Sequence, residues 1–254
     1  MSGPDQTAVY VISSGRPLNV APMTALLTDP DSPGPVTWVV PADQARTYTE
    51  AGARSVIGVD DPPPGASPLS RARNTALDHA EAAGHLCCQV DDDLRALYRL
   101  TADRTRAPAQ WPTVRQALAA ALTGDQAPYL AGIAPTSNPL SARHTQTDWG
   151  FVIGSLCLTR PGSGVRFDET LPLKEDYDYT CRHLEAHGRI ARLNWLFADM
   201  AHYTNRGGAV AYRTAALEAR TAARLLERWP DYLKPHPRRD HEVSFRPRPK
   251  KASL

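Results

Sequence analysis

The chain has 254 residues, of which 42% are hydrophobic and 22% charged, and its formal net charge is +2 at pH 7. This composition is typical of a globular protein with a buried core and excludes a chain dominated by disorder. The best uncharged apolar run, residues 151–159, has half of the ~18 residues needed to cross a bilayer, which excludes a transmembrane helix. Residues 1–7 lack the basic and apolar regions of a signal peptide, so we expect a cytoplasmic protein.

The charge is unevenly distributed along the chain. Residues 234–254 carry a net charge of +5, which leaves the rest of the protein mildly acidic. We therefore divide the chain into a short N-terminal tail, residues 1–7, a single folded domain, residues 8–233, and a basic Pro/Arg-rich C-terminal tail, residues 234–254, with little fixed structure. The four cysteines form no C-x-x-C pair, and we predict buried thiols rather than a disulfide or a zinc site.

Short apolar runs alternate with helical stretches in the first third of the chain. The predicted strands are residues 8–13, 36–40, 55–59 and 85–90. The predicted helical segments between them are residues 22–27, 42–51 and 70–80, the last capped by Ser67 or Ser70. This alternation predicts an α/β fold whose central sheet is mostly parallel.

The remaining elements are fewer and less regular. Residues 94–106 are interpreted as the exit from the strand at 85–90, and residues 129–142 as a loop with one strand at most. Helices are expected at residues 114–122 and 176–187, and strands at residues 149–159, interrupted by Gly154, and 189–197.

Three consecutive aspartates, Asp91, Asp92 and Asp93, follow the buried strand 85–90. Adjacent carboxylates repel one another unless a cation neutralises them, and hard divalent cations prefer carboxylate oxygens. Side chains alternate along an extended chain, so Asp91 and Asp93 share one side and can reach the same ion. We favour a metal site here; the alternative is a solvated acidic turn or the N-cap of a helix beginning at Leu94.

Cationic and glycine-containing segments lie near this acidic cluster. Arg71 and Arg73 belong to the preceding helix, and Ser13, Ser14, Gly15 and Arg16 form a loop after the first strand. Ser14 and Gly15 can offer backbone N–H groups to a ligand. The sequence contains no Walker-type or G-x-G-x-x-G motif, so a P-loop or Rossmann-type phosphate cradle is not expected.

Two further segments could carry chemistry. Residues 174–178, K-E-D-Y-D, open a helix, where acidic residues are favoured by the helix dipole; one of these carboxylates could instead act as a general base. Residues 202–208, H-Y-T-N-R-G-G, follow the last predicted strand. His202 could complete a metal site, although a histidine is more often structural, and residues 205–208 could bind phosphate oxygens.

Four segments together resemble one family of enzymes. They are S-R-A-R-N-T-A-L, Q-T-D-W-G-F-V-I-G-S-L, L-K-E-D-Y-D-Y-T and H-Y-T-N-R-G-G-A, in that order, with the D-x-D signature at residues 91–93 between the first two. The chain resembles the TET-associated glycosyltransferases of bacteriophages and bacteria, over roughly residues 9–210. The resemblance implies a single GT-A-type nucleotide-sugar-binding domain and, if the protein is phage-encoded, a location in the host cytoplasm.

The resemblance also implies roles for individual residues. The donor would be a nucleotide diphosphate sugar, most simply a UDP-sugar, held with Mn²⁺ or Mg²⁺. Metal ligands would be Asp93, Asp91 and His202. Donor contacts would come from Ser13, Ser14, Gly15, Arg16, Arg71, Arg73, Asn74, Asp91, Asp92, Arg206, Gly207 and Gly208. Asp176 would be the base of an inverting transfer, with Glu175 or Asp178 important if configuration is retained. Acceptor contacts are assigned to Gln146, Trp149, Gly154 and Lys174.

The acceptor implied by the resemblance is DNA containing 5-hydroxymethylcytosine or 5-hydroxymethyluracil. The hydroxymethyl group projects into the major groove, so such an enzyme must enter the groove, flip the base or act on single strands. The basic tail would contact phosphates without reading sequence. Three alternatives remain open: a small-molecule, peptide or glycan acceptor, a metal-dependent nucleotidyltransferase, and a DNA-binding relative without turnover. The oligomeric state is not indicated by the sequence.

Overall fold

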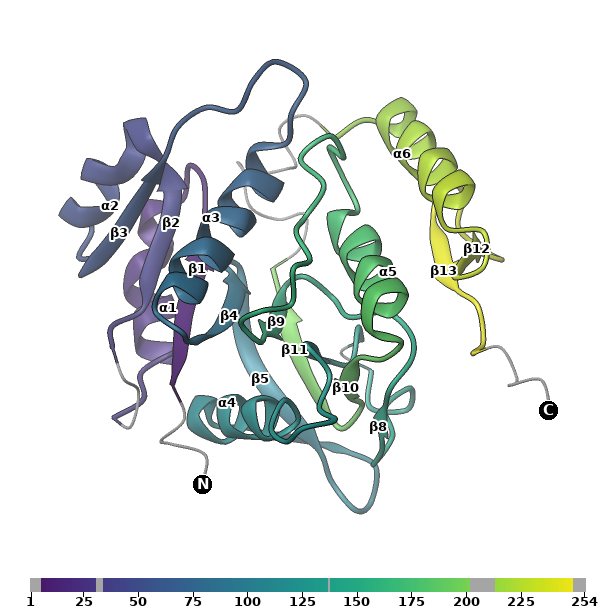
Figure 1. Ribbon diagram of the computed structural model, residues 1–254. Coiled ribbons are helices and arrows are strands. Elements are labelled where there is room, and N and C mark those ends of the chain that lie inside the picture. Colours follow the sequence, from purple (N-terminus) through teal and green to yellow (C-terminus); the bar gives the residue numbers. More distant parts are fainter. Residues whose placement is uncertain (1–5, 31–33, 137, 202–212, 249–254) are drawn as a thin grey trace.

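The computed structural model describes residues 6–30, 34–136, 138–201 and 213–248. It has an eight-stranded central sheet with strand order β3-β2-β1-β4-β9-β7-β10-β8 (Figure 1). Four of the seven strand pairs are parallel, and the α/β class with a mostly parallel sheet is confirmed. The sheet strands are β1 (Thr7–Ile12), β2 (Thr37–Pro41), β3 (Ser55–Val59), β4 (Leu86–Asp91), β7 (Leu130–Ile133), β8 (Gln146–Thr147), β9 (Leu156–Thr159) and β10 (Ala191–Leu193).

Helices cover both faces of this sheet. The covering helices are α1 (Val20–Leu26), α2 (Ala45–Glu50), α3 (Pro68–Ala82), α4 (Trp111–Ala120) and α5 (Glu175–His187), with short 3-10 turns η1 (Pro17–Asn19) and η2 (Ala42–Gln44). Helix α6 (Ala215–Arg228) packs instead against α5 and the C-terminal hairpin. Helix α3 begins as the sequence indicates, because Pro68 occupies its first position and the Ser67 side chain accepts a hydrogen bond from the Ser70 backbone N–H.

Strand β1 lies between β2 and β4 in the sheet, so the strands that follow it in the sequence lie on both sides of it. Ile12 at the end of β1 is paired in register with Asp91 at the end of β4. Ligands of open α/β sheets bind beyond the carboxyl ends of the strands, at the point where the strand order reverses. The topology therefore brings the loop after β1 and the three aspartates to the same edge.

Strand β9 runs antiparallel to both of its neighbours, β4 and β7. The strand expected at residues 149–159 is shorter in the structure. Strand β9 begins at Leu156, and the residues before it form a loop. The reason lies at Gly154. Its backbone N–H donates to Asp176 and its carbonyl accepts from Arg73, so these groups cannot join the sheet.

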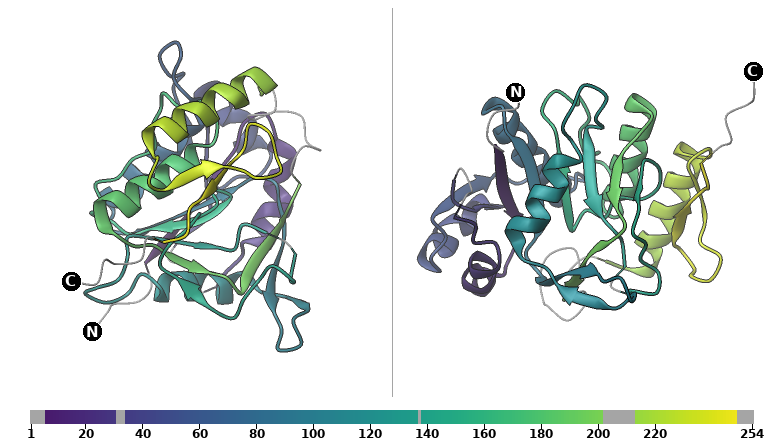
Figure 2. Two further views of the ribbon diagram at one scale, coloured as in Figure 1. Left: turned by 90° about the vertical axis from the view of Figure 1, so that its right-hand side faces the viewer. Right: turned by 90° about the horizontal axis from the view of Figure 1, so that it is seen from below.

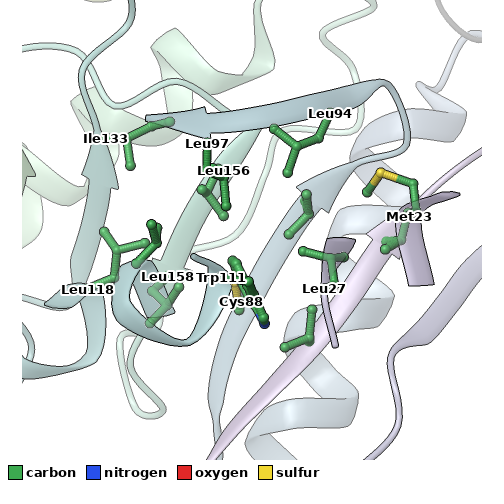
Figure 3. Packing of buried hydrophobic residues seen from close by; sticks show 14 of the residues in the cluster. Met23, Leu27, Cys88, Leu94, Leu97, Trp111, Leu118, Ile133, Leu156 and Leu158 are labelled. Carbon is green, nitrogen blue, oxygen red and sulfur yellow. The ribbon is translucent and has the colours of Figure 1, made fainter. Parts of the chain in front are cut away.

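Two apolar cores lie on the two faces of the sheet. One contains Met23 and Leu27 of the α1 region with Trp111 and Leu118 of α4, packed against sheet residues such as Leu158 (Figure 3). The other packs α3 and α5 against the opposite face, through residues such as Ala76 and Tyr179. Figure 2 shows the resulting layers from two further directions.

A buried ion pair supports the first of these cores. The Arg115 guanidinium of α4 donates to Asp29 over 2.7 Å, with both side chains at most 1% exposed. This pair ties α4 to the segment after α1.

The segment expected to be only an exit, residues 94–106, is a small sheet instead. Strand β5 (Leu94–Leu100) pairs with β6 (Arg106–Pro108) and with β11 (Leu196–Met200). The single strand expected at 189–197 is accordingly divided between β10 and β11, which belong to different sheets. Leu94 and Leu97 face the first core, which explains why this segment is folded back (Figure 3).

The C-terminal region is more ordered than we expected. Residues after 233 form a hairpin of β12 (Leu233–Pro235) and β13 (Val243–Phe245), which packs beside α6 (Figure 1). Leu225 of α6 and Leu233 and Val243 of the hairpin are buried with Leu171 and Cys181 in a third apolar cluster. The expectation of a tail with little fixed structure is therefore wrong for residues 234–248, because their apolar side chains cover α5.

The four cysteines are buried and none forms a disulfide, as predicted. Within the described ranges no helix combines the length and the apolar character needed to cross a membrane.

We predict that the stability of the fold decreases in acid because of His183 on α5. Its ring is fully buried, and neither ring nitrogen has a hydrogen-bond partner among the described residues. Burial, reinforced by neighbouring His187, lowers the pKa of His183 to about 3. Between pH 6.5 and about 3 the unfolded chain binds a proton that the folded chain excludes, so this residue lowers the free energy of unfolding as pH falls, by roughly 1.4 kcal/mol per pH unit.

Urea unfolding of wild type and His183→Leu between pH 4 and 8 measures this effect. The variant should show a shallower decline below pH 6.5, whereas His144→Leu, which changes an exposed ring, should match wild type. Equal slopes in wild type and His183→Leu would contradict the prediction.

Candidate functional site

A cavity of about 920 Å³ opens at the carboxyl ends of β1 and β4. It is lined by the loops after β1 and β3, the loop before β9, the start of α5 and the C-terminal hairpin. The carboxylates of residues 91–93 and of Glu175 and Asp176 are among the lining groups. The volume is at the upper end of what a small-ligand site typically has, which leaves room for two ligands.

Arg73 is the buried cation at the centre of the site. Its side chain is 2% exposed and contacts Asp91 at 2.8 Å and Glu175 at 3.2 Å. Burial alone would lower its pKa, but the two carboxylates more than offset this and hold the pKa above its ordinary value. The guanidinium also donates to the Gly154 carbonyl over 3.1 Å. One side chain from α3 thus joins β4, α5 and the loop before β9.

The three aspartates have different surroundings. Asp91 pairs with Arg73, whereas Asp92 pairs with Arg16 at 2.6 Å and accepts a hydrogen bond from the Ser13 hydroxyl. Burial raises the pKa of Asp92 to about 6, against the opposing effects of Ser13 and Arg16. Asp93 lines the cavity and its backbone carbonyl accepts from Ala201 N–H. Asp91 and Asp93 are therefore the two carboxylates best placed for a cation.

The described part of the chain contains no cluster of three or more His, Cys, Asp or Glu side chains able to hold a metal. Two cavity-lining carboxylates still fit a cation of the Mg²⁺ type, which is commonly held by one or two carboxylates together with substrate phosphates. The expected late ligand His202, and Arg206, Gly207 and Gly208, lie outside the described residues.

The loop after β1, to which donor contacts are assigned, lines the cavity from Ser13 to Arg16. Its backbone groups are partly committed within the protein, however. The Gly15 N–H donates to the Gln44 side chain over 2.7 Å, and the Arg16 N–H donates to the Tyr48 hydroxyl over 2.9 Å. The expectation that the Gly15 N–H is offered to a ligand is not met, because Gln44 occupies it.

The second acidic cluster lies at the first turn of α5. Asp176 accepts from the Gly154 N–H over 3.1 Å and lines the cavity. Its burial and the adjacent Glu175 charge raise the pKa of Asp176 well above its ordinary value, although the Gly154 hydrogen bond lowers it. A carboxyl group with a raised pKa at a cavity wall has the properties of a general base working near neutral pH.

Lys174 precedes α5 in the left-handed backbone conformation, with φ of 56°. Its buried ammonium lies between Glu218 of α6, at 2.6 Å, and Glu242 of the hairpin, at 2.9 Å. Lys174 lines the cavity, but its charge is used to hold the C-terminal elements against α5.

Several expected site residues do not line the cavity. Arg71 pairs with Glu169 at 3.8 Å, and Asn74 donates to the Phe167 carbonyl, because both lie on other faces of α3 than Arg73. Asp178 is fully buried and pairs with Arg182 and Arg228, facing α6 rather than the cavity.

The expected acceptor residues also need correction. Gln146 is in β8, at the end of the sheet order, and Trp149 donates to the Arg246 carbonyl and stacks on Tyr232. Gly154 acts behind the cavity wall. A Cβ there would come within 3.1 Å of Arg73 and Asp176, so a larger residue would crowd the two side chains that contact its backbone.

Other cavity residues were not identified from the sequence. They are Phe151, Tyr177, Arg192, His236, Arg239, Glu242 and Phe245. Several follow no motif, and those of the hairpin belong to a segment expected to lack structure. The alternation of polar and apolar residues around Phe245 extends over too few residues to predict a strand.

No protein-family model matches the sequence, and no curated protein matches it. Solved structures do match the fold. It is a mixed α/β fold with a large, mostly parallel central sheet, similar to the fold of the matching structures. The structures in question are those of TarS from S. aureus.

The TarS 1–349 chain is 16% identical, with a TM-score of 0.51 over 87% of this chain and 65% of that one. The same fragment in complex with UDP-GlcNAc gives equal identity and TM-score, with 66% of that chain covered. In the crystal structure of TarS itself, the match covers 40% of that chain. This chain therefore spans less than two thirds of the length of the TarS chains, and the likeness shows the fold.

We predict that Arg73→Met destabilises the fold by about 3 kcal/mol or more, because it leaves the Asp91 and Glu175 carboxylates without their buried partner. Arg71→Met is the matched control: it removes a partly exposed pair from the same helix and should change stability by about 0.5 kcal/mol at most. The free energy of unfolding from denaturant titration measures both. A loss for Arg73→Met no larger than for Arg71→Met would show that the central cation is dispensable.

Proposed function

We propose that the protein is a metal-dependent GT-A-type glycosyltransferase that moves a sugar from a nucleotide diphosphate sugar, in the simplest case a UDP-sugar, to the hydroxymethyl group of 5-hydroxymethylcytosine or 5-hydroxymethyluracil in DNA. The observation that carries the proposal is the cavity at the carboxyl edge of the sheet, which is lined by carboxylates from the end of β4 and the start of α5. The likeness of the fold to TarS, which has been solved with UDP-GlcNAc, supports the donor class.

The donor is assigned to the side of the cavity formed by Ser13, Ser14, Gly15 and Arg16, next to Asp91 and Asp93. Bound Mn²⁺ or Mg²⁺ would supply positive charge to the departing diphosphate. Asp93, with Asp91, is the assigned ligand within the described chain. Arg73 holds Asp91 in place over 2.8 Å, so the two carboxylates keep a fixed arrangement.

Asp176 is assigned as the base of an inverting transfer. It takes the proton of the acceptor hydroxyl, the acceptor oxygen forms a bond to the anomeric carbon, and the bond from that carbon to the diphosphate oxygen breaks. The Gly154 N–H fixes the Asp176 carboxylate, and Glu175 raises its pKa. The nucleoside diphosphate leaves with both electrons of the broken bond.

The DNA acceptor rests on the family resemblance and on the charge of the cavity rim. His236 and Arg239 of the C-terminal segment line the cavity, in the part of the chain with a net charge of +5. Cations beside a cavity suit an acceptor that carries phosphates. A transferase acting on a glycan or another small acceptor through the same Asp176 is the second candidate, favoured by the small net charge of the whole chain, +2.

We predict sugar transfer when the protein is incubated with 5-hydroxymethylcytosine DNA, Mn²⁺ and a panel of nucleotide sugars. Mass spectrometry of the digested nucleosides should show a gain of one hexose or one N-acetylhexosamine on the modified base, and none on unmodified DNA. Asp93→Asn and Asp176→Asn should each lower turnover by at least about a hundredfold. Asp125→Asn, an exposed change outside the cavity, should retain it.

Two other outcomes would redirect the proposal. Metal-dependent donor hydrolysis without transfer to either hydroxymethylated pyrimidine would keep the transferase and reject the DNA acceptor. Release of pyrophosphate from a nucleoside triphosphate would instead identify a nucleotidyltransferase.

The pH profile provides a separate test of Asp176. Because its pKa is raised, the base is protonated and inactive at pH values where an ordinary aspartate, with a pKa of ~3.9, is already ionised. We therefore predict that kcat/KM rises with pH through an acid limb well above pH 4, and that Glu175→Gln shifts this limb to lower pH by removing a neighbouring negative charge. A limb near pH 4 in the wild type would argue against Asp176 as the base.

A further inference from the structure

Three aromatic side chains lie close together on the part of the cavity wall that includes the first turn of α5. Phe151 and Tyr177 stack with their centroids 4.0 Å apart and an interplanar angle of 8°, and Phe245 lies 6.1 Å from each at angles of about 20°. All three rings line the cavity and are half-buried. They come from the loop before β9, the first turn of α5 and the C-terminal hairpin, and so form an aromatic surface of near-parallel, stacked rings from three separate segments.

Arg192 of β10 lines the same side of the cavity. Its guanidinium donates to the Phe151 carbonyl over 3.0 Å and to the Asn194 side chain over 2.7 Å. Among the described residues no carboxylate lies within ion-pair distance of it. Burial lowers its pKa without any compensating carboxylate, which marks a cation held in a protein wall without its counter-charge. Such a group gains most from an anionic ligand.

Both features lie next to the assigned base. Tyr177 directly follows Asp176, and the loop that contains Phe151 also contains Gly154, whose N–H fixes the Asp176 carboxylate. Arg192 contacts the backbone of Phe151 itself. A ligand stacked on the aromatic surface would therefore lie beside the base, in the cavity that the loop after β1 also lines.

We propose that Phe151, Tyr177 and Phe245 form the subsite for a pyrimidine base flipped out of DNA, with Arg192 binding a phosphate next to that nucleotide. The proposal rests on the proposed function and adds where and how its acceptor is held. Near-parallel aromatic rings match the planar face of a base, and extruded bases are commonly held by such stacking. The uncompensated guanidinium matches the phosphate that accompanies every base in a strand but is absent from a free nucleoside.

The test compares an acceptor without phosphate with an acceptor that carries phosphates. One is the nucleoside 5-hydroxymethyl-2′-deoxycytidine and the other is a short single-stranded oligonucleotide that contains it. In the wild type the oligonucleotide should have the lower KM. Arg192→Met should raise KM for the oligonucleotide by on the order of tenfold and leave KM for the nucleoside unchanged. Arg220→Met, which removes an exposed arginine of α6, is the matched control and should alter neither value.

The aromatic surface is tested with a pair of variants at one position. Phe245→Leu should raise KM for both acceptors by on the order of tenfold because a stacking contact is lost. Phe245→Tyr keeps the ring and should retain the wild-type values. Affinity for UDP, measured by calorimetry, should be unchanged in all of these variants.

Three results would overturn the proposal. The first is an equal effect of Arg192→Met on both acceptors, which would indicate a purely structural role. The second is a loss of UDP affinity in that variant, which would place Arg192 on the donor. The third is unchanged KM values in Phe245→Leu. If the wild type transfers no sugar, the proposed function fails. Fluorescence anisotropy of the labelled oligonucleotide then tests the subsite separately, by measuring binding. Binding by wild type that is lost in Arg192→Met supports the subsite, and absence of binding by wild type rejects it.

Discussion

The site depends on one buried cation. Arg73 reaches from α3 to Asp91 at the end of β4 and to Glu175 at the start of α5, and it also takes the Gly154 carbonyl. Without its charge, two carboxylates would lie side by side in a region of low polarity, which is strongly unfavourable. The arginine therefore allows acidic groups from distant parts of the sequence to gather at one cavity. Its contact with Gly154 also explains why the strand β9 begins only at Leu156.

Much of the first third of the fold could be predicted from local patterns. Strands β1 to β4 are short apolar runs bounded by glycine, proline or charged residues, and their helices have recognisable starts, as at Ser67. Strand β5 could not be predicted in this way. Its buried residues, including Leu94 and Leu97, follow no simple alternation, because the strand pairs with β11, about a hundred residues later in the sequence. The C-terminal hairpin was missed for a similar reason: its buried residues are few and are meaningful only against α5.

The candidate site, like the fold, could be predicted from the sequence only in part. Residues within motifs, such as Asp93, Arg73 and Asp176, line the cavity, since a strand end and a helix start fix where they lie. Neighbours in the same motifs, such as Asn74 and Asp178, face elsewhere, because adjacent helix positions point in different directions. Arg192 illustrates what sequence alone cannot give. An isolated arginine in a strand has no distinguishing pattern, and its importance follows only from the absence of a carboxylate around it among the described residues.

The reversed strand β9 also determines which loops can reach a ligand. A parallel strand presents the loop that follows it to the cavity edge, whereas β9 presents the loop that precedes it, so Ile153 and Ser155 reach the cavity before the strand begins. The turn after β9 is at the opposite edge of the sheet, away from the cavity. Insertions and deletions between β7 and β9 would thus reshape the ligand-facing surface of this protein, while those between β9 and residue 165 would leave it intact. The segment between β7 and β9 could therefore vary, and change which ligands fit the cavity, without altering the packing of the sheet.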